Sequence, residues 1–127
     1  TYKNKASPND YKRFLYSLWN NKLPYSKEIK RLMALPGRDR IYSGVEEIPK
    51  STLVYNKTGT TSRVCGDVGI INARDKKGGR KPYIIIGIIK NEKRSKNYSA
   101  WKSSRGNIIR EISGMTYNYF KEKYNLL

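Results

Sequence analysis

The first clear pattern along the chain is an apolar stripe with helical period between residues 8 and 19. Its members are Tyr11, Phe14, Leu15, Leu18 and Trp19. Ser7 is the expected N-cap of this helix, and Pro8 suits the first helical position because it has no N–H to leave unpaired. Asp10, three residues after the cap, completes a near capping box beside the positive helix N-terminus. Asn20-Asn21 is predicted to end the helix.

A second, shorter helix is predicted to follow. Ser26 is its expected N-cap. Its apolar face would consist of Ile29, Leu32 and Met33. Pro36-Gly37 is expected to terminate it. Residues 38–50 have no clear period and are predicted to be irregular.

The period changes to that of strands after Pro49. Three runs favour extended structure, at residues 52–60, 64–73 and 83–90. Short links join them, including a basic turn at 74–82, which favours an antiparallel meander. The third run is so rich in isoleucine that burial on both faces is predicted.

A long helical pattern completes the chain. Residues spaced by threes and fours along it are Trp101, Arg105, Ile108, Ile109, Ile112, Met115, Thr116, Tyr119 and Phe120. Gly106 and Gly114 are weak points, each costing about 1 kcal/mol relative to alanine. The predicted class is α+β. A three-stranded sheet with a buried strand needs further cover and partner strands, so we expect this to be part of a larger fold.

Composition excludes several kinds of chemistry. The chain has 127 residues, a formal net charge of +17, one cysteine and no histidine. Without histidine there is no Ser-His-Asp or Cys-His machinery and no histidine metal site. Cys65 alone forms no intrachain disulfide and no cysteine-rich metal site. We therefore expect no metal and no cofactor, and no apolar run is long enough for a membrane-spanning helix.

One short motif on the first predicted strand carries chemistry, namely Lys57-Thr58-Gly59-Thr60. A hairpin, an apolar strand and a long terminal helix follow it. This arrangement resembles the C-terminal part of class A β-lactamases and related penicillin-recognising serine hydrolases, in which a Lys-Thr/Ser-Gly triad lines the active-site cleft on an edge strand. Ser7-Pro8-Asn9-Asp10 is similar to the Thr-Pro-x-Asp start of a late helix in that family. Taken alone, the tripeptide also fits an exposed lysine before a turn in any β-rich protein.

The resemblance implies a role for each residue of the motif. Lys57 would be the catalytic residue here, a fixed positive charge near the nucleophile and the substrate carboxylate. Thr58 and Thr60 would offer hydroxyls to that carboxylate, and the Thr60 N–H would serve an oxyanion hole. Gly59 would leave room for substrate along the strand. Arg63 would supplement the carboxylate site.

Two neighbouring residues are given structural roles. Asp67 is read as a buried or capped acid near the hairpin. Cys65 is read as a small, half-buried side chain, because no base accompanies it to make it a nucleophile.

The resemblance also implies parts that residues 1–56 lack, a Ser-x-x-Lys nucleophile motif and a Ser-Asp-Asn-type loop. Ser99–Lys102 matches Ser-x-x-Lys but follows the Lys-Thr-Gly triad, so we treat the match as coincidence. We expect residues 1–127 to be the C-terminal portion of a single β-lactamase-like domain. Its helical part would be 7–50, and its sheet and terminal helix 52–127. The upstream nucleophile half would be another chain or a missing segment.

The function implied by the resemblance is acyl-serine chemistry on β-lactam or D-Ala-D-Ala-like substrates, in the periplasm or outside the cell. The chain alone is not expected to be competent. Two alternatives remain open. One is a non-catalytic relative that keeps the fold for partner binding. The other is a basic module for nucleic acid or an anionic surface, acting through Lys76, Lys77, Arg80, Lys81, Lys90, Lys93, Arg94 and Lys96.

Overall fold

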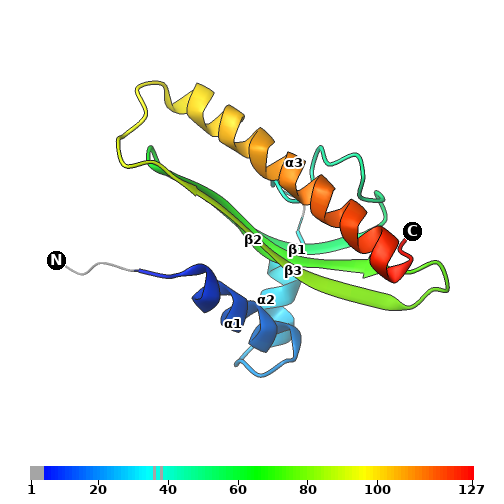
Figure 1. Ribbon diagram of the computed structural model, residues 1–127. Helices are drawn as coiled ribbons and strands as arrows, with labels where there is room; N and C mark the ends of the chain where they lie inside the picture. Colours follow the sequence, from blue (N-terminus) through cyan, green and yellow to red (C-terminus); the bar gives the residue numbers. More distant parts are fainter. Residues whose placement is uncertain (1–4, 36, 38) are drawn as a thin grey trace.

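The structure is a computed structural model that describes residues 5–35, 37 and 39–127. Its elements are α1 (Pro8–Trp19), α2 (Ser26–Met33), β1 (Leu53–Thr60), β2 (Val64–Arg74), β3 (Arg80–Lys90) and α3 (Tyr98–Tyr124). The strands form one antiparallel sheet in the order β1-β2-β3. The long helix α3 lies across one face of the sheet, and α1 and α2 lie on the other (Figure 1). The predicted meander with two preceding helices and one long terminal helix is confirmed.

The first helix begins as its sequence predicts. The Ser7 hydroxyl accepts a hydrogen bond from the Asp10 N–H at 3.2 Å, and the Asp10 carboxylate accepts one from the Ser7 N–H at 2.8 Å. The pKa of Asp10 is lowered, because the Ser7 backbone N–H and the Ser7 side chain both form hydrogen bonds that favour the carboxylate. Asn20 is the C-cap.

The second helix begins differently from the prediction. Its N-cap is Tyr25, in the left-handed region at φ 60°, and no side chain caps the helix. The Ser26 hydroxyl instead donates to the Leu23 carbonyl at 2.6 Å, so it closes the preceding turn. Leu32, predicted on the apolar face, is half exposed. Pro36, predicted to end this helix with Gly37, lies outside the described residues.

The third strand also corrects the sequence analysis. It begins at Arg80 and so takes in Pro82, which had been assigned to the turn. Proline is tolerated because β3 pairs with β2 alone among the described strands. Burial on both faces was wrong: Ile85 is buried while Ile88 is 39% exposed. An edge strand with partial cover on the α1 face buries mainly its other face.

Two hydrophobic clusters lie on opposite faces of the sheet. The larger one joins the sheet to α3 and the irregular segment 39–48, through Ile41, Val45, Ile48, Val54, Cys65, Ile71, Ala73, Ile85, Trp101, Ile109, Tyr117 and Leu126. The smaller one joins it to α1 and α2 through Leu15, Leu18 and Ile70, with half-buried side chains around them. No helix in the described part of the chain is long and apolar enough to cross a membrane.

The glycines of α3 are contact points for segment 39–48. A Cβ atom at Gly106 would lie 3.3 Å from Arg40 Nε, and one at Gly114 would collide with the Glu47 carboxylate. Glycine at both positions, which were predicted to weaken the helix, thus lets segment 39–48 pack closely against α3. The predicted apolar stripe is divided between two faces, since Ile112 is half exposed while Ile109 is buried.

Candidate functional site

The Lys-Thr-Gly-Thr motif occupies the last four positions of β1 at the edge of the sheet. Each motif residue pairs with β2, where Lys57 lies opposite Val68 and Gly59 lies opposite Gly66. No other described strand pairs with β1. The outer edge of β1 therefore offers its unpaired backbone groups to an extended ligand, as in β-strand addition.

Lys57 carries an exposed charge on the face of the sheet that α1 and α2 cover in part. Its partner across the strands, Val68, belongs to the α1/α2 cluster, and residues directly opposite each other share a face. The Lys57 ammonium donates to the carbonyl of its neighbour Thr58 at 2.8 Å. The only salt bridges among the described residues lie in α1 and α2. The Lys57 charge is therefore free to meet an anion.

Gly59 and Gly66 lie opposite each other on β1 and β2, but the surroundings favour glycine at the two positions for different reasons. A Cβ atom at Gly66 would lie 3.3 Å from the Gly87 carbonyl oxygen, so packing within the sheet favours glycine there. A Cβ atom at Gly59 would meet no atom of the described residues within 4 Å. The fold itself does not require glycine at position 59, whereas a ligand lying along the strand edge would.

A buried arginine reaches the end of the motif. Arg40 is 5% exposed, and its guanidinium donates to the Thr60 hydroxyl at 2.6 Å and to the Gly66 carbonyl at 2.9 Å. Because the Thr60 oxygen accepts from a cation, the hydroxyl proton remains free to donate to another group. Sequence reasoning missed Arg40, since it lies in a segment without period and 20 positions before its partner.

Asp67 holds this arginine in place. Its buried carboxylate accepts from the N–H groups of Arg40 and Ile41, at 2.8 and 2.9 Å, and from the Asn56 amide at 2.9 Å. Burial raises the pKa of Asp67, and these three donors oppose the rise. The structural role predicted for Asp67 is confirmed. Cys65, predicted half-buried, is fully buried.

The remaining predicted site residues lie close to the same edge. Thr58 is half-buried and lies opposite Asp67, on the face that α3 covers. Arg63 is exposed in the turn between β1 and β2, where its N–H donates to the Thr61 hydroxyl at 3.1 Å. The structure therefore brings Lys57, Gly59, Thr60 and Arg63 to one end of β1, while their roles stay predictions.

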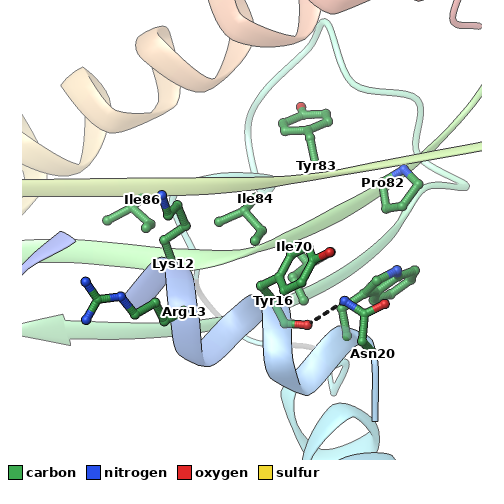
Figure 2. Close-up of a pocket in the computed structure, with 10 residues that line it drawn as sticks. Lys12, Arg13, Tyr16, Asn20, Ile70, Pro82, Tyr83, Ile84 and Ile86 are labelled. Carbon is green, nitrogen blue, oxygen red and sulfur yellow. Dashed lines mark hydrogen bonds between the residues drawn. The ribbon is translucent and has the colours of Figure 1, made fainter. Parts of the chain in front are cut away.

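A groove of about 690 Å³ lies between α1 and β3, on the α1/α2 side of the sheet (Figure 2). Its lining residues are Lys12, Arg13, Tyr16, Trp19, Asn20, Ile70, Pro82, Tyr83, Ile84 and Ile86. These walls are mainly hydrophobic, and no motif residue is among them. Within the described residues, no group of three or more histidine, cysteine, aspartate or glutamate side chains could hold a metal ion.

Comparison with known families identifies the fold. The family model described as "Beta-lactamase enzyme family" matches residues 1–120. The chain belongs to the β-lactamase enzyme family. It is a relative of the penicillin-recognising serine hydrolases, and its elements form part of a β-lactamase-like fold, as the sequence predicted. A comparison with curated proteins found no significant match.

Two solved structures resemble this β-lactamase-family chain. One is a structure of PBP-A, with 20% sequence identity and a TM-score of 0.66. The other is the PBP-A L158E mutant as an acyl-enzyme complex with penicillin G, with 21% identity and a TM-score of 0.65. Each match covers 92% of this chain and 40% of the PBP-A chain. The likeness establishes the fold, and the chain spans less than half the length of these relatives.

Proposed function

We propose that this chain is the Lys-Thr-Gly-bearing portion of a serine hydrolase that acts through an acyl-serine on β-lactam or D-Ala-D-Ala-like substrates. The observation that carries the proposal is Gly59, a glycine on the open edge of β1 with empty space where its Cβ would be. A substrate amide pairs with that edge as an added strand. Family membership supports the chemistry, and the outside of the cell or the periplasm is the proposed location.

Each motif residue then has a defined task. Lys57 keeps a positive charge beside the nucleophile and stabilises negative charge as it develops. The Thr60 hydroxyl, which accepts from Arg40, donates its own proton to the substrate carboxylate. Thr58 and Arg63 add polar contacts to the same carboxylate, and the Thr60 N–H contributes to the oxyanion hole.

The nucleophile belongs to a complementary portion, supplied upstream in the same protein or by another chain. Three features of the described residues support this division. The outer edge of β3 has no strand partner, a large hydrophobic groove lies beside α1, and apolar side chains are exposed along α3. These exposed apolar side chains on α3 include Ile108, Ile112, Met115 and Tyr119. A complementary portion would cover these surfaces and present its serine to Lys57.

Fluorescent penicillin tests the proposal, because β-lactam hydrolysis and peptide trimming both begin with acylation of serine. The full-length protein is expected to form a covalent fluorescent adduct. Lys57→Ala should slow adduct formation by about 100-fold, as expected when a preorganised charge is removed. Lys76→Ala, in the exposed β2–β3 turn, is the matched control and should label normally.

Two results would overturn the proposal. One is a folded full-length protein that forms no adduct. The other is equal labelling of Lys57→Ala and wild type, which would leave Lys57 without a catalytic role. A biological function that survives Lys57→Ala would favour the non-catalytic relative, which keeps the fold for partner binding.

A further inference from the structure

A strongly basic surface adjoins the Lys-Thr-Gly edge, and we call it the basic end. It consists of Arg63, Lys90, Lys93, Arg94, Lys96, Lys102 and Arg105, with Glu92 as the one acidic residue among them. Arg63 comes from the turn after β1. The others come from the end of β3, the segment that leads to α3, and the first turns of α3.

Hydrogen bonds bring these segments together just past Thr60. The Asn91 N–H donates to the Arg63 carbonyl at 2.8 Å, and the Ser95 N–H donates to the Ser62 carbonyl at 2.9 Å. The Trp101 indole N–H donates to the Thr61 carbonyl at 3.0 Å. Figure 1 shows the β1–β2 turn and the loop before α3 at one end of the molecule, away from the β2–β3 turn.

The charges of the basic end have no acidic partner in the described part of the chain. None of its seven cations forms a salt bridge among the described residues. Arg105 is stacked on the Trp101 ring, with its guanidinium carbon 4.6 Å from the ring centroid, and this holds one cation in place. The other six are on exposed or edge positions. Clustered like charges repel each other, and binding of a polyanion would relieve this repulsion.

We propose that the basic end binds a linear phosphodiester polymer that carries no bases, along the turn 61–63 beside the Lys57 edge. Lysine and arginine on flexible stems match phosphates spaced along a chain. Binding of single-stranded nucleic acid normally adds a row of aromatic stacking platforms. Here Trp101 is buried and Tyr98 is the one exposed aromatic residue near the cations in the described part of the chain. This binding goes beyond the acyl-serine chemistry and does not depend on it.

Salt-dependent binding of poly(glycerol phosphate) to the full-length protein tests the proposal. Replacing Lys93, Arg94 and Lys96 together by glutamine should weaken binding on the order of tenfold and reduce the salt slope by about 2. The control replaces Lys76 and Lys77 in the β2–β3 turn and Lys81 at the start of β3 by glutamine, which removes the same charge. This control should change affinity by about twofold or less, because salt screens charges beyond about 10 Å.

Three results would overturn the inference. The first is no measurable binding at low salt. The second is an equal loss in the two triple variants, which would mean that net charge alone attracts the polymer. The third is tighter binding of oligo(dT) with the same number of phosphates, which would indicate a nucleic-acid site. Penicillin labelling of the same variants reports separately on the acyl-serine chemistry and should stay unchanged.

Discussion

The two faces of the sheet differ in how completely this chain covers them. On the α3 face, twelve buried residues form one cluster, and the buried Asp67 carboxylate has three hydrogen-bond donors. On the α1/α2 face, the cluster has three fully buried members among the described residues, and a groove of about 690 Å³ remains beside β3. Lys57 lies on this second, less covered face.

The α3 face therefore supports the edge strand, whereas the α1/α2 face leaves the motif accessible. The α3 face holds the edge strand in position, since Arg40 and Asp67 tie segment 39–41 to β1 and β2. The α1/α2 face leaves the Lys57 ammonium and the space over Gly59 open. A rigid scaffold on one side and an accessible edge on the other is the arrangement that a substrate-binding strand needs.

Two adjacent isoleucines on β3 give the largest expected effect. Ile85 lies in the α3 cluster and Ile84 borders the groove. In this chain alone, Ile85→Ala should lower the free energy of unfolding by about 3 kcal/mol and Ile84→Ala by about 1 kcal/mol. In the full-length protein the cost of Ile84→Ala should rise, because the proposed complementary portion would cover it. Urea unfolding of both proteins measures this, and equal costs for Ile84→Ala in both would contradict the proposed cover.

Asp67 tests the polar support of the α3 face. Asp67→Asn puts an amide N–H₂ among three donors and should lower the free energy of unfolding by about 2–3 kcal/mol. Glu92→Gln, at an exposed position, is the control and should change it by less than about 0.5 kcal/mol. Thermal and urea unfolding provide the measurement. An unchanged free energy of unfolding in Asp67→Asn would mean that the three hydrogen bonds make no net contribution to stability.

The same pair of proteins has a pH signature. Burial raises the pKa of Asp67 in the folded state above its ordinary value of 3.8. The unfolded chain releases this proton near the ordinary pKa, whereas the folded protein keeps it until the pH passes the raised pKa. The stability from this group is therefore complete below pH 3.8 and is lost as the pH rises through the folded pKa. The difference in the free energy of unfolding between wild type and Asp67→Asn should therefore shrink as the pH rises. A difference that grows with pH would mean that folding lowers the pKa of Asp67 instead of raising it.

The opposed glycines give a smaller effect. Gly66→Ala should lower the free energy of unfolding by about 1–2 kcal/mol, because its Cβ would press on backbone at Gly87. Gly59→Ala should be neutral within about 0.5 kcal/mol, since its Cβ enters open space. Equal losses at both positions would show that the fold requires glycine 59 and would remove the argument for a ligand there.

Local signals in the sequence predicted much of the fold. The Ser7–Asp10 capping box depends on residues three apart, and the strand runs depend on an alternation within each run. The Lys57–Thr60 motif was found on its strand because the motif is contiguous. In each case the interacting groups lie close together along the chain.

Long-range contacts account for what the sequence did not reveal. Arg40 meets Thr60 across 20 positions. The α3 pattern could not show that segment 39–48 packs against Gly106 and Gly114, which selects the buried face of the helix. Burial of β3 was misjudged because α1 covers only part of its second face, where Ile84 and Ile86 are half-buried and Ile88 is exposed. These features depend on tertiary neighbours and not on period.

Substrate passage over Gly59 is tested most directly by the rate constant for acylation of the full-length protein by penicillin. Valine at this position suits a strand and fills the space that is open above Gly59. Gly59→Val should therefore keep its free energy of unfolding while the acylation rate falls by about 100-fold or more. A folded Gly59→Val protein that reacts as fast as wild type would contradict the assignment of the β1 edge as the substrate strand.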